Sequence, residues 1–156
     1  MKALCATIVA VGFLVAPVEA LSCKCVSTAK SEEEAVRLSL MSADAVVLAE
    51  AISIEVFPSK FDEMDTESQR VQWRVVKSWK GPHSKDQVVV SETVVTCCLC
   101  GVPAKKGDVF LIFRYQPEPF AISNCSRSGP ASRKQTEISV LDRLAATHDK
   151  TIEPTR

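Results

Sequence analysis

The chain has 156 residues, and its 19 lysines and arginines are balanced by 19 aspartates and glutamates, so its formal net charge is zero. Balanced charge excludes the basic footprint typical of nucleic-acid-binding proteins and the acidic excess that attracts a polycation. We therefore expect no nucleic-acid partner. The length of the chain indicates one domain of ordinary size.

The first residues are typical of a secretory signal. Lys2 gives a positive start, residues 3–16 are apolar, and small residues follow Pro17. This run is too short to span a bilayer, and charges interrupt every later hydrophobic segment, so no transmembrane segment is expected. We predict a signal peptide over residues 1–20, or to residue 22, and a single domain over residues 21–156. The mature chain is expected to be secreted and extracellular, or periplasmic or lipid-anchored in a bacterium.

Cysteines are the most informative residue type in the chain. One of the seven lies in the predicted signal, and an oxidising compartment favours disulfides among the other six, although six cysteines allow 15 pairings. A metal site is the alternative, but the spacings are not C-x2-C and neither histidine is near in sequence. No cofactor of the protein's own is expected. The six cysteines are Cys23, Cys25, Cys97, Cys98, Cys100 and Cys125.

A short helix is predicted directly after the first cysteine pair. Ser31 and Glu34 have the spacing of a capping box, and acidic residues stand where the helix dipole favours them. The expected apolar face of this helix is formed by Ala35, Leu38 and Met41.

Strands dominate the middle of the sequence. The apolar run that begins at Ala45 and then alternates to Val56 predicts a strand, and polar residues 58–68 predict a long loop. Further strands are expected over residues 71–79, 88–95, 109–113 and 120–125. A final helix is expected over residues 131–147, with Ile138, Leu141 and Leu144 on one face.

Five successive strands with one helix before them and one after predict a mainly β domain. The expected architecture is a five-stranded OB-like antiparallel barrel with flanking N- and C-terminal helices, stapled by disulfides. Because no helices separate the strands, a Rossmann or TIM architecture is not expected.

Residue patterns that indicate catalysis are missing from the sequence. It contains no G-x-S-x-G, no H-E-x-x-H and no phosphate-binding glycine loop. His83 is interpreted as a solvated turn residue, and His148 as a residue near a helix end. We therefore do not expect an enzyme.

Several segments, taken in order, resemble the netrin-like domain of the tissue inhibitors of metalloproteinases. The resemblance covers residues 23–125, and its order and spacing are more specific than any single piece. The matching segments are Cys23-Lys24-Cys25-Val26, Ser42-Ala43-Asp44-Ala45-Val46-Val47, Lys77-Ser78-Trp79-Lys80-Gly81, Cys100-Gly101-Val102 and Asn124-Cys125.

This resemblance implies an OB-like, netrin-like barrel with bonds Cys23–Cys100 and Cys25–Cys125. It also implies a secreted metalloproteinase inhibitor in which the amine and carbonyl of an N-terminal Cys23 chelate the zinc of a secreted or membrane-bound metalloproteinase. Lys24 would enter the S1′ pocket of the protease, and Cys25 and Val26 would complete the binding wedge, with Leu99 alongside. A monomer is expected.

Three questions stay open on the sequence alone. Cleavage after Ala20 leaves Leu21-Ser22 in front of Cys23, whereas cleavage after Ser22 frees the α-amine of Cys23. Lipidation of Cys23 would block that amine. Cys97 and Cys98 could pair with each other, remain thiols, or compete with Cys100 for Cys23. The alternative function is a non-inhibitory netrin-like module that binds a partner through its barrel face or residues 58–68.

Overall fold

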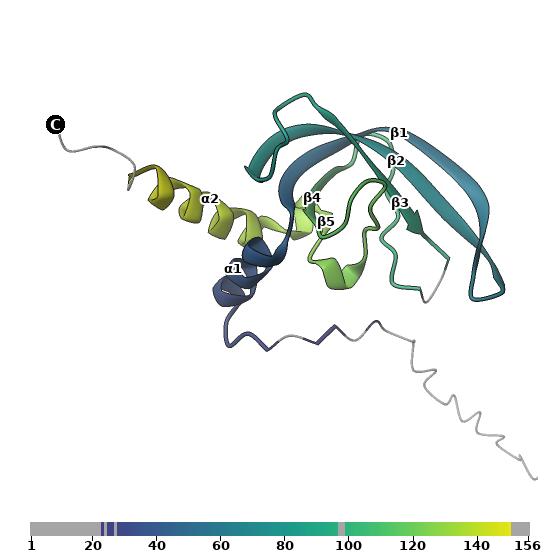
Figure 1. Ribbon diagram of the computed structural model, residues 1–156, viewed down its shortest axis with the longest axis horizontal. Coiled ribbons are helices and arrows are strands. Elements are labelled where there is room, and N and C mark those ends of the chain that lie inside the picture. Colours follow the sequence, from purple (N-terminus) through teal and green to yellow (C-terminus); the bar gives the residue numbers. More distant parts are fainter. Residues whose placement is uncertain (1–22, 24, 27, 97–98, 151–156) are drawn as a thin grey trace, which may run out of the picture.

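A computed structural model of the chain describes residues 23, 25–26, 28–96 and 99–150. The described part is mainly β, with a helix before the sheet and a helix after it (Figure 1). Single-turn 3-10 helices occupy Asn124–Ser126 and Ala131–Arg133. The helices and strands, in chain order, are α1 (Glu32–Ser42), β1 (Ala45–Phe61), β2 (Met64–Lys80), β3 (Val88–Val94), β4 (Val109–Arg114), β5 (Gly129–Pro130) and α2 (Gln135–Lys150).

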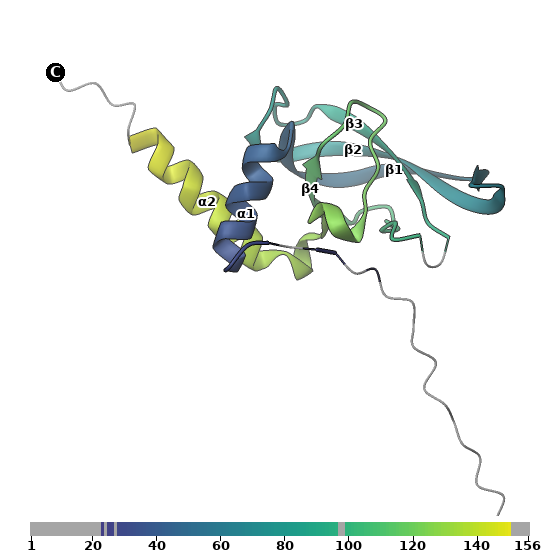
Figure 2. The same cartoon turned by 60° about the horizontal axis from the view of Figure 1, so that its bottom comes forward.

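The five strands form one antiparallel sheet in the order β3-β2-β1-β4-β5. The two helices lie together at one end of the molecule, and the β1–β2 hairpin extends to the other end (Figures 1 and 2). The expected five-stranded antiparallel sheet with flanking helices is therefore present. The sheet itself is open, since no strand ladder joins β3 to β5 in the described part of the chain.

Helix α1 begins at the predicted capping box. The Ser31 hydroxyl accepts a hydrogen bond from the Glu34 amide at 3.2 Å, and the Glu34 carboxylate accepts one from the Lys30 amide at 2.7 Å. At the other end, the Lys80 ammonium donates to the carbonyls of Leu40 and Met41. Both ends of the helix are thus satisfied by side chains.

The predicted apolar face of α1 is confirmed at Ala35 and wrong at Leu38 and Met41. The helix buries Ala35 and Val36 and packs Leu40 against α2, whereas Leu38 and Met41 are 46% and 71% exposed. At 3.6 residues per turn, Met41 lies about 120° around the helix from Ala35, while Val36 and Leu40 are only about 40° apart. The stripe that contains Val36 and Leu40 is therefore the one that reaches the core.

The long loop predicted over residues 58–68 is also wrong, because β1 and β2 continue through it as a hairpin. Asp62 and Glu63 form the turn with positive φ angles of 45° and 68°, as a two-residue turn of type I′ requires. The Ser59 hydroxyl is 2.8 Å from the hydroxyls of both Thr66 and Ser68. Cross-strand hydroxyl pairs stabilise this polar ribbon in place of apolar alternation.

Two clusters of buried side chains hold the domain together. The larger surrounds Trp73 and Phe110 of the sheet, whose ring centroids are 5.0 Å apart, and the Trp73 indole donates to the buried Ser91 hydroxyl at 2.8 Å. The second lies between the helices and β1 and β4, where Leu141 is buried and Ile138 and Leu144 pack beside it. The predicted inner face of the last helix is confirmed.

The chain after β4 differs from the predicted strand over residues 120–125. Phe120 forms only an isolated bridge to β3, residues 124–126 turn as a 3-10 helix, and the strand that pairs with β4 is Gly129–Pro130. Helix α2 accordingly starts at Gln135, and not at residue 131. Hydrogen bonds from Ile122 and Glu92 take the place of the expected ladder.

His83 is buried, which corrects the prediction of a solvated turn residue. Neither ring nitrogen has a hydrogen-bond partner. Asp86 and Gln87 hydrogen-bond back to Val75, so that this turn lies against the sheet and does not project into solvent.

Asp142 joins α2 to β2. Its carboxylate accepts hydrogen bonds from Lys77 at 2.7 Å and from the Trp79 indole at 2.6 Å. Partial burial raises the pKa of Asp142, but the hydrogen bonds from Lys77 and Trp79 and the charge of Lys77 outweigh burial, so the pKa lies below the ordinary 3.8. This carboxylate therefore stabilises the fold above its unfolded-state pKa, and the contribution disappears as pH falls through the folded pKa.

An Asp142→Asn variant is expected to lose about 0.5–1 kcal/mol of unfolding free energy at pH 7, because the pair is partly exposed. The difference from wild type should shrink as the pH falls below 3.8. Urea unfolding at pH 7 and pH 2.5 measures both effects, with the exposed Asp65→Asn as the control for charge. Equal differences at the two pH values would contradict this linkage.

Candidate functional site

Two disulfides attach the N-terminal segment to the domain. Cys23 is bonded to Cys100 and Cys25 to Cys125, across sequence separations of 77 and 100 residues. These are the two pairings that the resemblance implied. They attach Cys23 and Cys25 of the predicted wedge to one edge of the domain.

The two anchoring cysteines belong to neighbouring segments that are hydrogen-bonded to each other. The Asn124 amide donates to the Cys100 carbonyl at 2.9 Å, and the Val102 amide donates to the Ile122 carbonyl at 3.2 Å. Between these bonds, Gly101 and Ser123 form an antiparallel bridge. We call residues 100–102 and 122–125 the platform, because together they fix where both disulfides begin.

Gln69 of β2 holds the chain at Ala104, two residues after the first platform segment. The Gln69 side chain accepts a hydrogen bond from the Ala104 amide at 2.9 Å and donates one to the Ala104 carbonyl at 3.2 Å. Cys100 has a positive φ of 63°. A Cβ on Gly101 would lie 1.8 Å from the Val94 carbonyl oxygen, so the platform approaches β3 too closely for any side chain there.

The wedge presents an exposed edge. Cys23 is half-buried, Cys25 is exposed, and Val26 is 95% exposed. Leu99, which was expected beside the wedge, is half-buried and directly precedes Cys100. Lys24, Cys97, Cys98 and the predicted signal peptide lie outside the described residues.

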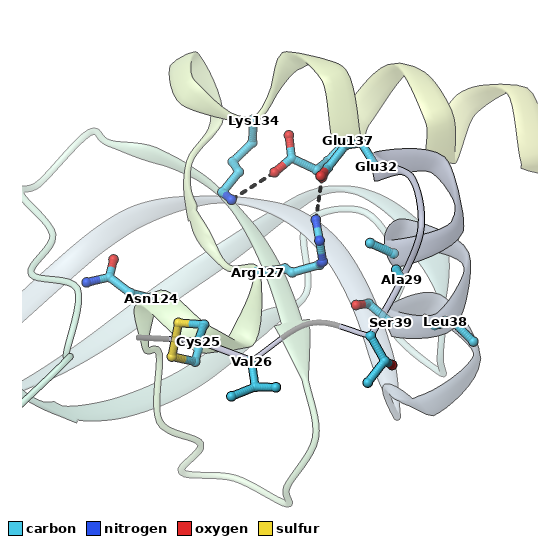
Figure 3. Close-up of a pocket in the computed structure, with 13 residues that line it drawn as sticks. Cys25, Val26, Ala29, Glu32, Leu38, Ser39, Asn124, Arg127, Lys134 and Glu137 are labelled. Carbon is cyan, nitrogen blue, oxygen red and sulfur yellow. Dashed lines mark hydrogen bonds and ion pairs between the residues drawn. A yellow bond between two sulfur atoms is a disulfide. The ribbon is translucent and has the colours of Figure 1, made fainter. Parts of the chain in front are cut away.

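A depression of about 470 Å³ separates the wedge from α1 (Figure 3). Two ion pairs line it: Arg127 with Glu32, and Lys134 with Glu137 at 2.8 Å. Glu137 is buried, and its pairing with Lys134 is what makes that burial tolerable. No local pattern indicates the pair of Glu32 and Arg127, because these residues are 95 positions apart. Lys134 and Glu137 are only three residues apart, a spacing at which opposite charges commonly pair on a helix, but sequence reasoning did not single them out.

A second depression, of about 270 Å³, is lined by Tyr115, Ser123 and Cys125 among others. Burial raises the pKa of the Tyr115 phenol, and hydrogen bonds with Ser39 and Ser42 of α1 partly oppose that rise. Tyr115 therefore lies between α1 and the depression that the platform residues Ser123 and Cys125 also line. Cys125 lines both depressions.

No family model matches this chain, and no curated protein matches it in sequence. Within the described residues, no group of three or more His, Cys, Asp or Glu side chains could hold a metal ion. Neither helix of the described part has the length and hydropathy needed to cross a bilayer.

Proposed function

We propose that this protein is a secreted metalloproteinase inhibitor of the netrin-like type. One observation carries the proposal: both cysteines of the N-terminal segment are bonded to the platform, while the outer edge of that segment is exposed. Such a rigid, protruding edge loses little conformational entropy when it enters a protease cleft. Disulfide bonding is compatible with an extracellular protein.

The proposed fold is an OB-like barrel whose closure is made by isolated hydrogen bonds. The Glu92 amide of β3 donates to the Phe120 carbonyl at 2.9 Å, and the Phe120 amide donates to the Val90 carbonyl at 3.3 Å. The Ile122 amide adds a bond to the Thr93 hydroxyl at 2.9 Å. These contacts between β3 and the segment before β5 support a barrel-like arrangement.

The proposed mechanism uses the first residue of the mature chain. A neutral amine and a carbonyl oxygen on Cys23 would bind the zinc of the target protease and displace the water that the metal activates. An α-amino pKa of roughly 8 makes deprotonation on binding inexpensive. The mechanism requires cleavage directly before Cys23, since residues left in front of it would convert the amine into an amide. The protein supplies no catalytic group of its own in this proposal.

The experiment is an inhibition assay with secreted protein whose intact mass has been measured. The mass reports the cleavage site, any lipid and the number of disulfides in one measurement. The protein is tested against catalytic domains of several zinc metalloproteinases, with a serine protease as the control. Inhibition confined to metalloproteinases by protein that starts at Cys23 would support the proposal, and a mature chain that starts at Leu21 would refute the mechanism.

The alternative function is a non-inhibitory binding module, and the β1–β2 hairpin is the observation that favours it. Beyond the neighbouring strands, the hairpin exposes Phe61 and Met64 on either side of its turn, with Val56 further along β1. A partner that binds this hairpin would not need the amine of Cys23. Unchanged partner binding after N-terminal extension, together with loss of binding in Phe61→Ser/Met64→Ser, would favour this function.

A further inference from the structure

The outer face of α1 is apolar and has no covering within the described chain. Leu38 and Met41 lie three residues apart on this face and are 46% and 71% exposed. Both residues have the hydrophobicity expected of core positions, yet the helix packs through its other side. Exposed apolar side chains that cluster in this way mark interaction surfaces more often than isolated ones do.

This face is continuous with the wedge. Leu38, Ser39 and Val26 line the same depression, which also includes the Cys25–Cys125 disulfide (Figure 3). Tyr115 contacts Ser39 and Ser42 of α1 and lines the second depression. Cys125 lines that depression as well. We define the helix patch as Val26, Leu38, Met41 and Tyr115, four exposed residues. Val26 and Leu38 line the first depression, Tyr115 lines the second, and Met41 follows Leu38 on the outer face of α1.

Charged groups around the helix patch are engaged in ion pairs. Glu32 pairs with Arg127, and Glu33 pairs with both Arg37 and Arg143. The patch therefore has apolar residues bordered by paired charges, an arrangement that resembles the core and rim of a protein interface. A strongly charged partner surface would gain little binding free energy from this patch, and an apolar partner surface would gain more.

The wedge alone is too small for a stable complex. Standard protein interfaces use about 20–30 residues on each side, whereas the wedge consists of four residues and Leu99. A protease that held the wedge in its cleft would place the rim of that cleft against adjoining surface. The helix patch is adjoining surface with the apolar character that such contact requires.

We propose that the helix patch is a second part of the protease-binding surface, which contacts apolar residues on the rim of the metalloproteinase cleft. This inference rests on the proposed function, and it names the face of the inhibitor that the enzyme covers. Tyr115 is the expected anchor, since tyrosine is enriched among residues that dominate binding energy.

The test is a Leu38→Gln/Met41→Gln variant, which keeps good helix-forming residues on the outer face. Val76→Thr/Val88→Thr removes a similar exposed apolar pair from β2 and β3 and is the matched control. Dissociation rates from a metalloproteinase catalytic domain that wild type inhibits are measured by surface plasmon resonance, and urea midpoints verify folding. We expect the helix variant to dissociate about 10–100 times faster with a similar association rate, and the control to match wild type.

Three outcomes would overturn the inference in distinguishable ways. Dissociation of the helix variant within twofold of wild type would overturn the helix patch and leave the inhibitor function standing. Absence of inhibition by wild type itself would refute the proposed function and this inference with it. A wild-type dimer in sedimentation that becomes a monomer in the helix variant would show that a second copy of the chain covers the patch.

Discussion

One alanine added in front of Cys23 is expected to abolish metalloproteinase inhibition while the protein stays folded. The addition converts the amine of Cys23 into an amide, which is a poor zinc ligand, and it places a residue where the metal would bind. Loss of a central contact of this kind costs about 4 kcal/mol or more, which is roughly a thousandfold in the inhibition constant. Inhibition constants for wild-type and extended proteins give the direct comparison.

A matched control adds one alanine after Arg156, far along the chain from the wedge. This control should inhibit like wild type, and both extended proteins should unfold at the same urea concentration. Full inhibition by the N-terminally extended protein would show that zinc chelation by Cys23 is not the mechanism. That result would favour the alternative function, in which a partner binds the exposed β1–β2 hairpin.

Gly101→Ala is expected to be the most destabilising single methyl addition in the platform. The new Cβ would lie 1.8 Å from the Val94 carbonyl oxygen and 2.9 Å from the Thr93 methyl, and the carbonyl is backbone that cannot rotate away. Overpacking of this severity costs about 3 kcal/mol. For a domain of this size the loss lowers the melting temperature by roughly 10 °C.

Gly129→Ala is the control for this substitution. Its Cβ would meet only the end of the Lys134 side chain, at the ordinary contact distance of 3.5 Å. Scanning calorimetry on the two variants should therefore give a large decrease for position 101 and a small one for position 129. A similar melting temperature for both variants would mean that the platform can move away from β3.

Local signals in the sequence identified the parts of the fold that depend on local chemistry. Ser31 and Glu34 marked the start of α1 because a capping box satisfies backbone groups within one turn. The spacing of Ile138, Leu141 and Leu144 gave the inner face of α2 because those residues share one stripe. The cysteine pairings came from a resemblance, since spacing alone left all 15 open.

Other features depended on contacts between distant segments, which no local pattern reports. The polar residues of the β1–β2 hairpin lack alternation, yet their backbone pairs throughout because Asp62 and Glu63 accept positive φ angles. One of the two ion pairs beside the wedge joins Glu32 to Arg127 across 95 positions. At the wedge itself, the sequence supplied the residues, and the fold supplied the platform and Gln69 that position them.

The long sequence separations of the two disulfides have a consequence for biosynthesis. During the proposed secretion, which begins with the N-terminus, Cys25 would reach the oxidising side of the membrane about 100 residues before its partner Cys125. Throughout that interval, the segment bearing the proposed metal-binding amine lacks its second anchor. A fragment truncated before Cys125 could not form that bond at any later time. Functional inhibitor would therefore accumulate only after nearly the whole domain has been exported and oxidised.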